Sequence, residues 1–171
     1  YSEDHTPNPI QTYGRTKRAG ERAVFEANAD SLILRLSFVY GIHRSSGDLT
    51  GFPVWVRDEL CAGNEVPLFT DQHITPSRAG QVADTVFDLV ATDKNGFFHV
   101  TCRSCVTPYQ FGQEIASRVS ATGNIVESSR TNVDQTAPRP EYNCLDVDKV
   151  ETTLDRSQPT LDEDLDKLTT F

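Results

Sequence analysis

SLILRLSFVY, residues 31–40, is a dense run of aliphatic and aromatic side chains that Gly41 closes. A continuous apolar run of this length, bounded by a glycine, is typical of a strand buried on both faces of a parallel sheet. Helical patterns precede and follow it, at residues 13–28 and 78–92. Strands that alternate with helices predict an α/β architecture.

Apolar stripes predict which face of each helix is buried. Val82, Val86, Phe87 and Val90 share a stripe in the helix expected at 78–92. A helix over 52–62 is expected to point Val54, Trp55 and Leu60 inward. The remaining elements are strands at 66–69 and 97–100, loops at 71–76 and 128–143, and helices at 108–120, 146–154 and 161–168, with Thr107 as an N-cap and Thr160 and Glu163 as a capping box.

Tyr13-Gly-Arg-Thr-Lys17 opens the first predicted helix and places a phenol and an ammonium on one helix face. A phenol is a weak acid with an ordinary pKa of about 10, and a nearby cation stabilises its phenolate form. Such a pair can exchange a proton with a substrate oxygen near neutral pH. The ammonium can also hydrogen-bond the ribose of a nicotinamide cofactor. The alternative is a solvated helix face with an incidental tyrosine.

The surroundings of this pair resemble the extended short-chain dehydrogenase/reductases, and within them the dTDP-4-dehydrorhamnose reductase subgroup. The resemblance extends in order over nearly the whole chain. It rests on NPIQTYGRTKRAGE at residues 8–21, LILRLSFVYG at 32–41, DQHITPS at 71–77, APRP at 137–140 and LD at 145–146.

The resemblance implies a fold and a reaction. The fold would be the C-terminal part of a Rossmann-type NAD(P)-binding domain, residues 1–45 and 78–100, with a small α/β substrate-binding domain, residues 46–77 and 101–171. The reaction would be reduction of the 4-keto group of a deoxy nucleotide sugar by NADPH or NADH, in the biosynthesis of dTDP-rhamnose or another polysaccharide precursor. The alternatives are a nucleotide-sugar epimerase or dehydratase, and a non-catalytic regulatory subunit of the methionine adenosyltransferase type.

The resemblance also implies residue roles. Tyr13 would protonate the sugar C4 oxygen as the hydride arrives, and Lys17 would tune Tyr13 and hold the nicotinamide ribose. Phe38, Val39 and Tyr40 would line the junction of the cofactor and substrate sites. Phe38 stands where the subgroup has Trp, which keeps an aromatic wall but leaves the sugar specificity open.

The nucleotide or its diphosphate would be gripped by Gln72 and Arg139, although Arg139 is as well explained as a loop anchor. Two other charged residues have structural interpretations. Arg35 lies within the apolar run, where an unpaired charge is costly, and is expected to form an ion pair. Asp71 is expected to form a turn rather than to act as an acid.

The chain lacks two parts that a complete reductase needs. It contains no Gly-rich turn for the cofactor pyrophosphate, and the expected catalytic Ser or Thr would lie some two dozen residues before Tyr13. It starts with Tyr1 and contains no Met, which is typical of a fragment. The 171 residues alone are therefore expected neither to bind NADPH tightly nor to turn over.

The formal net charge is −9, from 25 acidic and 16 basic residues. A surface of this charge repels the phosphate backbone and argues against nucleic acid as a partner. Acid-rich, lysine-poor composition suits high salt, so a halophilic source and ordinary drift to a low pI are both open. No apolar run approaches the about 20 residues that span a bilayer. A cytoplasmic monomer or homodimer without membrane contacts is expected.

Four cysteines admit three interpretations. Cys102 and Cys105 have the spacing of half a zinc site, but a second pair is missing and the histidines are scattered, so no metal is expected. A redox pair typically opens a helix, whereas here the helix begins at Thr107 and Pro108. The favoured expectation is that all four are free thiols.

Overall fold

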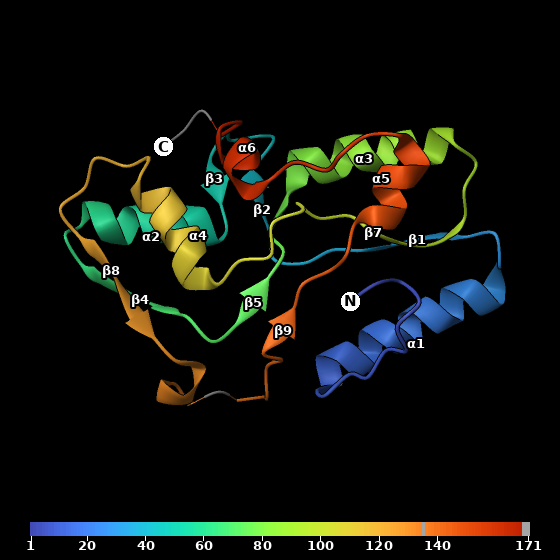
Figure 1. Cartoon of the computed structure of the whole chain (residues 1–171), viewed down its shortest axis with the longest axis horizontal. Coiled ribbons are helices and arrows are strands. Elements are labelled where there is room, and N and C mark those ends of the chain that lie inside the picture. Colours follow the sequence, from blue (N-terminus) through green and yellow to red (C-terminus); the bar gives the residue numbers. More distant parts are fainter. Residues whose placement is uncertain (135, 169–171) are drawn as a thin grey trace.

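The computed structural model describes residues 1–134 and 136–168 and has the α/β architecture that the sequence predicts (Figure 1). The elements are α1 (Thr12–Ala27), β1 (Leu32–Arg35), β2 (Val39–Ile42), β3 (Leu49–Thr50), α2 (Phe52–Cys61), β4 (Glu65–Phe69), β5 (His73–Ile74), β6 (Ser77–Arg78), α3 (Ala79–Ala91), β7 (Gly96–His99), α4 (Pro108–Ala116), β8 (Asn124–Ser128), a 3₁₀ turn (Arg130–Asn132), β9 (Tyr142–Asn143), α5 (Asp148–Leu154) and α6 (Leu161–Leu165).

β1 and β7 pair in parallel, with Leu32 opposite Gly96 and Arg35 opposite His99. Helices cover the two faces of this pair: α1 lies on one side, and α3 and α5 lie on the other (Figure 1). Leu89, Phe98 and Val150 form the buried centre on the α3 and α5 side. This helix–strand–helix layering is the arrangement that positions α1, which carries the Tyr-Lys pair.

The predicted strand over residues 31–40 is two short strands. Phe38 has a φ of 48°, in the left-handed region, and this turn separates β1 from β2. β2 then pairs in parallel with β6 and antiparallel with β3 instead of continuing beside β7. The four residues of β1 are half-buried, so the prediction of a fully buried strand was wrong. Every residue of α1 is likewise exposed or half-buried.

A larger core lies beyond β2, around α2, β4, α4 and α6. Phe111 of α4 is fully buried and contacts three rings: those of Phe52 at 5.0 Å, Tyr40 at 5.3 Å and Phe38 at 6.2 Å between centroids. α4 begins at the predicted N-cap, where Thr107 and Gln110 form a capping box. The capping box of Thr160 and Glu163 at α6 is also confirmed.

The predicted buried face of α3 was wrong. Phe87 is 76% exposed and Val90 62% exposed, while Gln81, Thr85 and Leu89 are buried. The amide of Gln81 and the hydroxyl of Thr85 both hydrogen-bond Gln158 far along the chain, so this polar stripe has partners inside the fold.

Trp55 is also misassigned by its pattern. It was expected to point inward, but it is 45% exposed. Its helix α2 buries Leu60, as predicted, together with Pro53 and Val56. Trp55 still contacts Phe52, with 5.9 Å between ring centroids.

Five strands appear where none was predicted or where loops were expected: β3, β5, β6, β8 and β9. β8 pairs in parallel with β4 over five residues, and β5 pairs with β9 over two. β5 and β9 are too short to show a period in the sequence. Helices α4 and α6 end earlier than predicted, at Ala116 and Leu165. Within the described residues, no helix is both long enough and apolar enough to cross a membrane.

Candidate active site

The site begins at the first turn of α1. Gln11 is extended and ends the N-terminal loop, so the helix starts at Thr12 and Tyr13 follows at once. The Lys17 Nζ lies 5.5 Å from the centroid of the Tyr13 ring, on the helix face that the four-residue spacing predicts. Tyr13 is 67% exposed.

α1 is held against β1 by an ion pair and against β7 by one ring contact. Glu21 accepts two hydrogen bonds from Arg35, at 2.7 Å from Nε and 2.8 Å from Nη2, which confirms the predicted ion pair of Arg35. The hydrogen bond that Arg35 donates to Glu21 raises the pKa of Arg35, so the guanidinium stays charged. Phe25 stacks on Phe97 with 6.2 Å between centroids. Tyr13, Lys17 and Glu21 are spaced at four residues, so the same bond fixes the orientation of all three.

Two cavities meet at Tyr13. The first, of about 480 Å³, is lined by Tyr13, Lys17, Glu21 and Arg35 and by the N-terminal loop. The second, of about 440 Å³, is lined by Tyr13, Phe38, Gln72 and Arg139. Tyr13 thus borders both the cavity that Lys17 lines and the cavity that Gln72 and Arg139 line.

The structure brings together most of the predicted site residues, with two exceptions. Phe38 lines the second cavity and packs its ring on Phe52 at 5.3 Å. Tyr40 is 2% exposed and belongs to the large core, and burial raises the pKa of its phenol. Val39 is 53% exposed. Neither Val39 nor Tyr40 is among the described residues that line the two cavities.

Gln72 is 7% exposed, which leaves only its edge open to the second cavity. Arg139 is exposed, and its carbonyl accepts a hydrogen bond from Arg130 Nη1 at 2.8 Å. Asp71 accepts hydrogen bonds from the Ser129 hydroxyl at 2.6 Å and the Arg130 amide at 2.9 Å. The Ser129 bond is the main reason that the pKa of Asp71 is lowered. These bonds give Asp71 a structural role, but they anchor a segment 58 residues away, whereas the sequence predicted a local turn.

Four residues that border both cavities were not predicted as site residues: Gln11, Pro140, Asn143 and Leu145. Asn143 is the second residue of β9, which pairs with β5, and Leu145 lies two residues after Asn143. Asn143 lies between the APRP and LD segments of the sequence, and Leu145 is the first residue of the LD segment. Their place at these two segments was the signal that could have identified them as site residues. The pairing of β9 with β5, which brings them to the site, joins residues about 70 apart in the chain, so no local pattern shows it.

The expectation of four free thiols was wrong. Cys105 and Cys144 form a disulfide with a Cα–Cα distance of 5.6 Å. Their separation of 39 residues hides the pairing from the sequence, and the fold brings them together beside β5. Cys61 and Cys102 are free, and burial raises the pKa of the Cys102 thiol to about 12. Within residues 1–134 and 136–168, no three His, Cys, Asp or Glu side chains gather to form a metal site.

A parallel strand pair between helices, with a Tyr-x-x-x-Lys pair on the preceding helix, defines a Rossmann-type short-chain dehydrogenase/reductase. The match to known proteins narrows this class. The chain belongs to the RmlD substrate binding domain family, whose sequence profile matches residues 1–170.

Curated relatives carry reductase names. The chain is 51% identical over 166 residues to the probable low-salt glycan biosynthesis reductase Agl14 of Haloferax volcanii, covering 96% of this chain and 55% of that protein. It is 30% identical over 154 residues to a probable dTDP-4,6-dihydroxy-2-methyloxan-3-one 4-ketoreductase of Streptomyces antibioticus, covering 87% of this chain and 50% of that protein. The chain thus spans about half the length of the curated relatives it matches.

A solved structure shares the fold. The dTDP-4-dehydrorhamnose reductase of Bacillus anthracis, solved in complex with NADP, matches with a TM-score of 0.89 at 25% identity. The match covers 98% of this chain and 58% of that one. The Rossmann-type α/β architecture that the sequence predicts is confirmed by this match.

Proposed function

We propose that this chain forms the proton-donating and substrate-binding part of an NADPH- or NADH-dependent reductase that reduces the 4-keto group of a deoxy nucleotide sugar. The observation that carries the proposal is the position of Tyr13 between the two cavities. A ketone reductase needs a proton donor placed between the hydride source and the carbonyl. Tyr13 is the titratable residue that borders both spaces.

The chemistry follows from the Tyr13–Lys17 pair. Bound NADPH supplies the hydride that adds to the carbonyl carbon. Tyr13 donates its phenolic proton to the ketone oxygen, and the Lys17 ammonium stabilises the phenolate that remains. Lys17 is also placed to hydrogen-bond the ribose from the first cavity.

The second cavity suits the rest of the substrate. Gln72 and Arg139 offer an amide and a guanidinium to the diphosphate or its nucleoside, and the aromatic ring of Phe38 offers a flat wall to the sugar. This substrate class is supported by the similarity to the probable 4-ketoreductase of Streptomyces antibioticus and to the dTDP-4-dehydrorhamnose reductase of Bacillus anthracis.

The proposed division of the chain into a cofactor-binding side and a substrate-binding side is partly supported by its two hydrophobic clusters. Residues 1–45 and 78–100 would belong to the cofactor-binding side, and 46–77 and 101–171 mainly to the substrate side. One cluster centres on β7 and α3 but also contains Val147 and Val150 from the substrate side, and the other centres on α2, β4 and α4 but also contains Tyr40 from the cofactor side. The sequence contains no Gly-rich phosphate turn, so the isolated chain should bind NADPH weakly. Calorimetric titration of the isolated chain with NADPH tests this, and tight binding would contradict it.

The proposed setting is the cytoplasm of a salt-adapted cell, as a monomer or homodimer. The net charge of −9 and the 51% identity to a protein of Haloferax volcanii support salt adaptation. NADPH and nucleotide sugars are themselves cytoplasmic metabolites.

The experiment is NADPH oxidation by the full-length protein with dTDP-4-keto-6-deoxyglucose. dTDP-glucose, which carries a hydroxyl at C4, is the control. Oxidation with the keto sugar alone supports the proposal. Protein that binds NADPH but oxidises it with no 4-keto nucleotide sugar would instead point to a non-catalytic regulatory subunit.

A further inference from the structure

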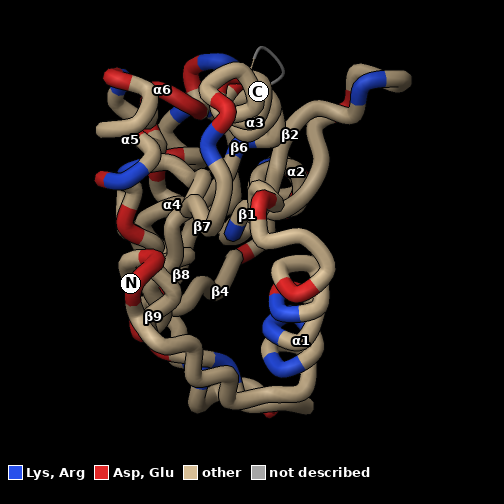
Figure 2. The backbone as a smooth tube through the Cα atoms, turned by 90° about the vertical axis from the view of Figure 1, so that its right-hand side faces the viewer, with Lys and Arg blue, Asp and Glu red and all other residues tan. Residues whose placement is uncertain are grey.

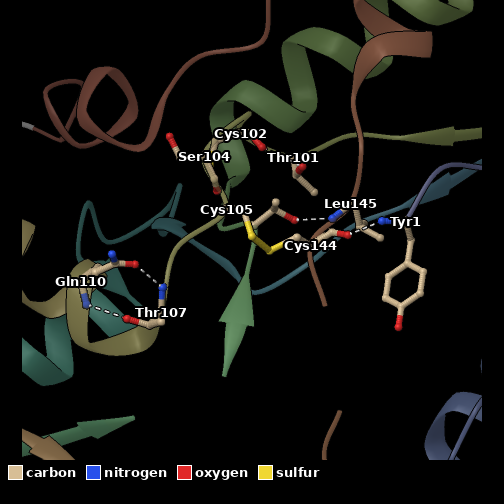
Figure 3. Close-up of a disulfide and its surroundings, with 10 residues drawn as sticks. Tyr1, Thr101, Cys102, Ser104, Cys105, Thr107, Gln110, Cys144 and Leu145 are labelled. Atoms are coloured by element: carbon tan, nitrogen blue, oxygen red, sulfur yellow. Dashed lines mark hydrogen bonds between the residues drawn. A yellow bond between two sulfur atoms is a disulfide. The ribbon is translucent and has the colours of Figure 1, made fainter. Parts of the chain in front are cut away.

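We propose that the Cys105–Cys144 disulfide positions the substrate-side wall of the Tyr13 site and that its reduction weakens substrate binding. This inference rests on the proposed function. The disulfide joins the loop before α4 to the residue that follows β9, and Figure 3 shows its two cysteines between Thr107 and Leu145.

The disulfide closes a three-segment arrangement around β5. Ile74 exchanges backbone hydrogen bonds with Val106, at 2.8 and 2.9 Å, and pairs with Asn143 on its other side. Cys105 and Cys144 each lie one residue from these pairing residues. The covalent bond therefore ties the two outer segments together beside β5.

β9 is two residues long, and its other anchors are non-covalent. The Tyr142 ring stacks on His73 with 4.3 Å between centroids, and Arg130 pairs with the exposed Glu141 at 3.6 Å. The His73 amide donates to the Glu141 carbonyl at 2.7 Å, and the Leu145 amide donates to Thr75 Oγ1 at 3.3 Å. The amino group of Tyr1 donates to the Cys144 carbonyl at 2.8 Å (Figure 3). A two-residue strand with exposed hydrogen bonds opens easily, so a covalent tie has a large effect on its position.

The tied segment carries the wall of the site. Arg139 and Asn143 both line the second cavity, and Asn143 also lines the first. The wall is thus attached directly to Cys144. Loosening this wall moves groups that contact the substrate but does not change the position of Tyr13 and Lys17. Those two residues lie on α1, which the Glu21–Arg35 hydrogen bonds hold in place.

The bond is open to chemical reduction. Cys105 is exposed and Cys144 is half-buried, so a dithiol can reach the sulfurs. Reduction breaks the S–S bond and forms two thiols, and the dithiol supplies two electrons and two protons and becomes a disulfide itself. Cys102 is no competitor, because it is buried and its Sγ donates to the Ser104 carbonyl.

The test is steady-state kinetics of the full-length protein, oxidised and after treatment with dithiothreitol. We expect KM for the 4-keto sugar to rise about tenfold on reduction, with kcat within about twofold, and to return on reoxidation. The double variant Cys105→Ser/Cys144→Ser should have the high KM of the reduced protein, and dithiothreitol should not change its KM. Cys61→Ser, which removes an exposed free thiol, should behave as wild type.

A second measurement separates this inference from the proposed function. Amide hydrogen exchange over residues 139–146 should be faster in the double variant than in the oxidised protein, with α1 unchanged. If no sugar is reduced in either redox state, the proposed function fails, while faster exchange still supports the positioning role. Equal exchange in both states, or a KM that reduction leaves unchanged, would overturn the inference.

Discussion

Glu21 and Arg35 connect the helix that carries the Tyr-Lys pair to the strand behind it. Both side chains are about one-fifth exposed, and two charge-assisted hydrogen bonds join them. Every residue of α1 is exposed or half-buried, so burial of apolar side chains contributes little to the attachment of this helix. The ion pair is therefore the main anchor of the site at the level of single residues.

Replacing Glu21 with Gln should lower the free energy of unfolding by about 1–3 kcal/mol, because it leaves Arg35 without its charged partner. Urea denaturation followed by circular dichroism measures the change. Glu26→Gln is the matched control on the same helix. Glu26 pairs with Arg22 at 3.5 Å with both side chains about 70% exposed, and its loss should cost less than about 0.5 kcal/mol. Equal effects of the two substitutions would contradict the anchoring role.

Local spacing made some residues of the site predictable. Tyr13, Lys17 and the ion pair of Arg35 follow from a helix period and from the cost of a buried charge. Asn143 and the Cys105–Cys144 disulfide depend on contacts between distant segments, and no local pattern reports them.

At the scale of elements, the helices were predicted more reliably than the strands. The helices have caps and periods that the sequence shows, whereas β5 and β9 are two residues each and β8 has a weak alternation. The break between β1 and β2 needs a left-handed φ at Phe38, a residue type that gives no sign of it. The prediction of the buried face of α3 was wrong for a related reason. Gln81 and Thr85 are buried because they hydrogen-bond Gln158, which is more than 70 residues away in the chain.

α6 is attached to β6 through a buried acid. Asp164 is 1% exposed and accepts a hydrogen bond from Arg78 Nε at 2.8 Å. Burial raises the pKa of Asp164 despite that partner. A raised folded-state pKa means that the contribution of Asp164 to stability is fully present below its unfolded pKa of about 4 and is lost as pH rises through the folded value.

Urea denaturation at a series of pH values tests this linkage. Relative to Asp164→Asn, the wild type should lose stability as pH rises from about 4 through the raised pKa. The variant should also have a lower free energy of unfolding by an amount that does not vary with pH, because Arg78 loses its charged partner. Asp166→Asn, at a 66% exposed side chain, is the control substitution that leaves Asp164 and Arg78 in place. A difference between wild type and Asp164→Asn that does not vary with pH, or that grows in favour of wild type as pH rises, would contradict the assignment.

At the scale of the whole molecule, acidic residues outnumber basic ones by nine. Figure 2 shows basic residues following one another along α1, while acidic residues are spread over α5, α6 and their neighbours. α1 is thus a local exception on an acidic protein. The charge suits an anionic substrate that approaches the site beside α1.

The excess negative charge should make stability depend on salt. Raising KCl from about 0.1 M to about 1 M shortens the Debye length from about 10 Å to about 3 Å and screens the repulsion among carboxylates. Salt also weakens the surface ion pairs, but exposed pairs contribute little. We therefore expect the melting temperature to rise with KCl in differential scanning calorimetry, with sucrose as a control that screens no charge. A flat or falling melting temperature would show that carboxylate repulsion is not a significant cost in the folded state.

The most direct test of the whole account is the kcat of the full-length protein with Tyr13→Phe. Loss of the phenolic proton should lower kcat with the 4-keto sugar about 100- to 10,000-fold, with NADPH affinity kept. Tyr109→Phe, the same change on α4, should keep the wild-type rate. A Tyr13→Phe protein that keeps more than about a tenth of the wild-type kcat would contradict the assignment of Tyr13 as the proton donor.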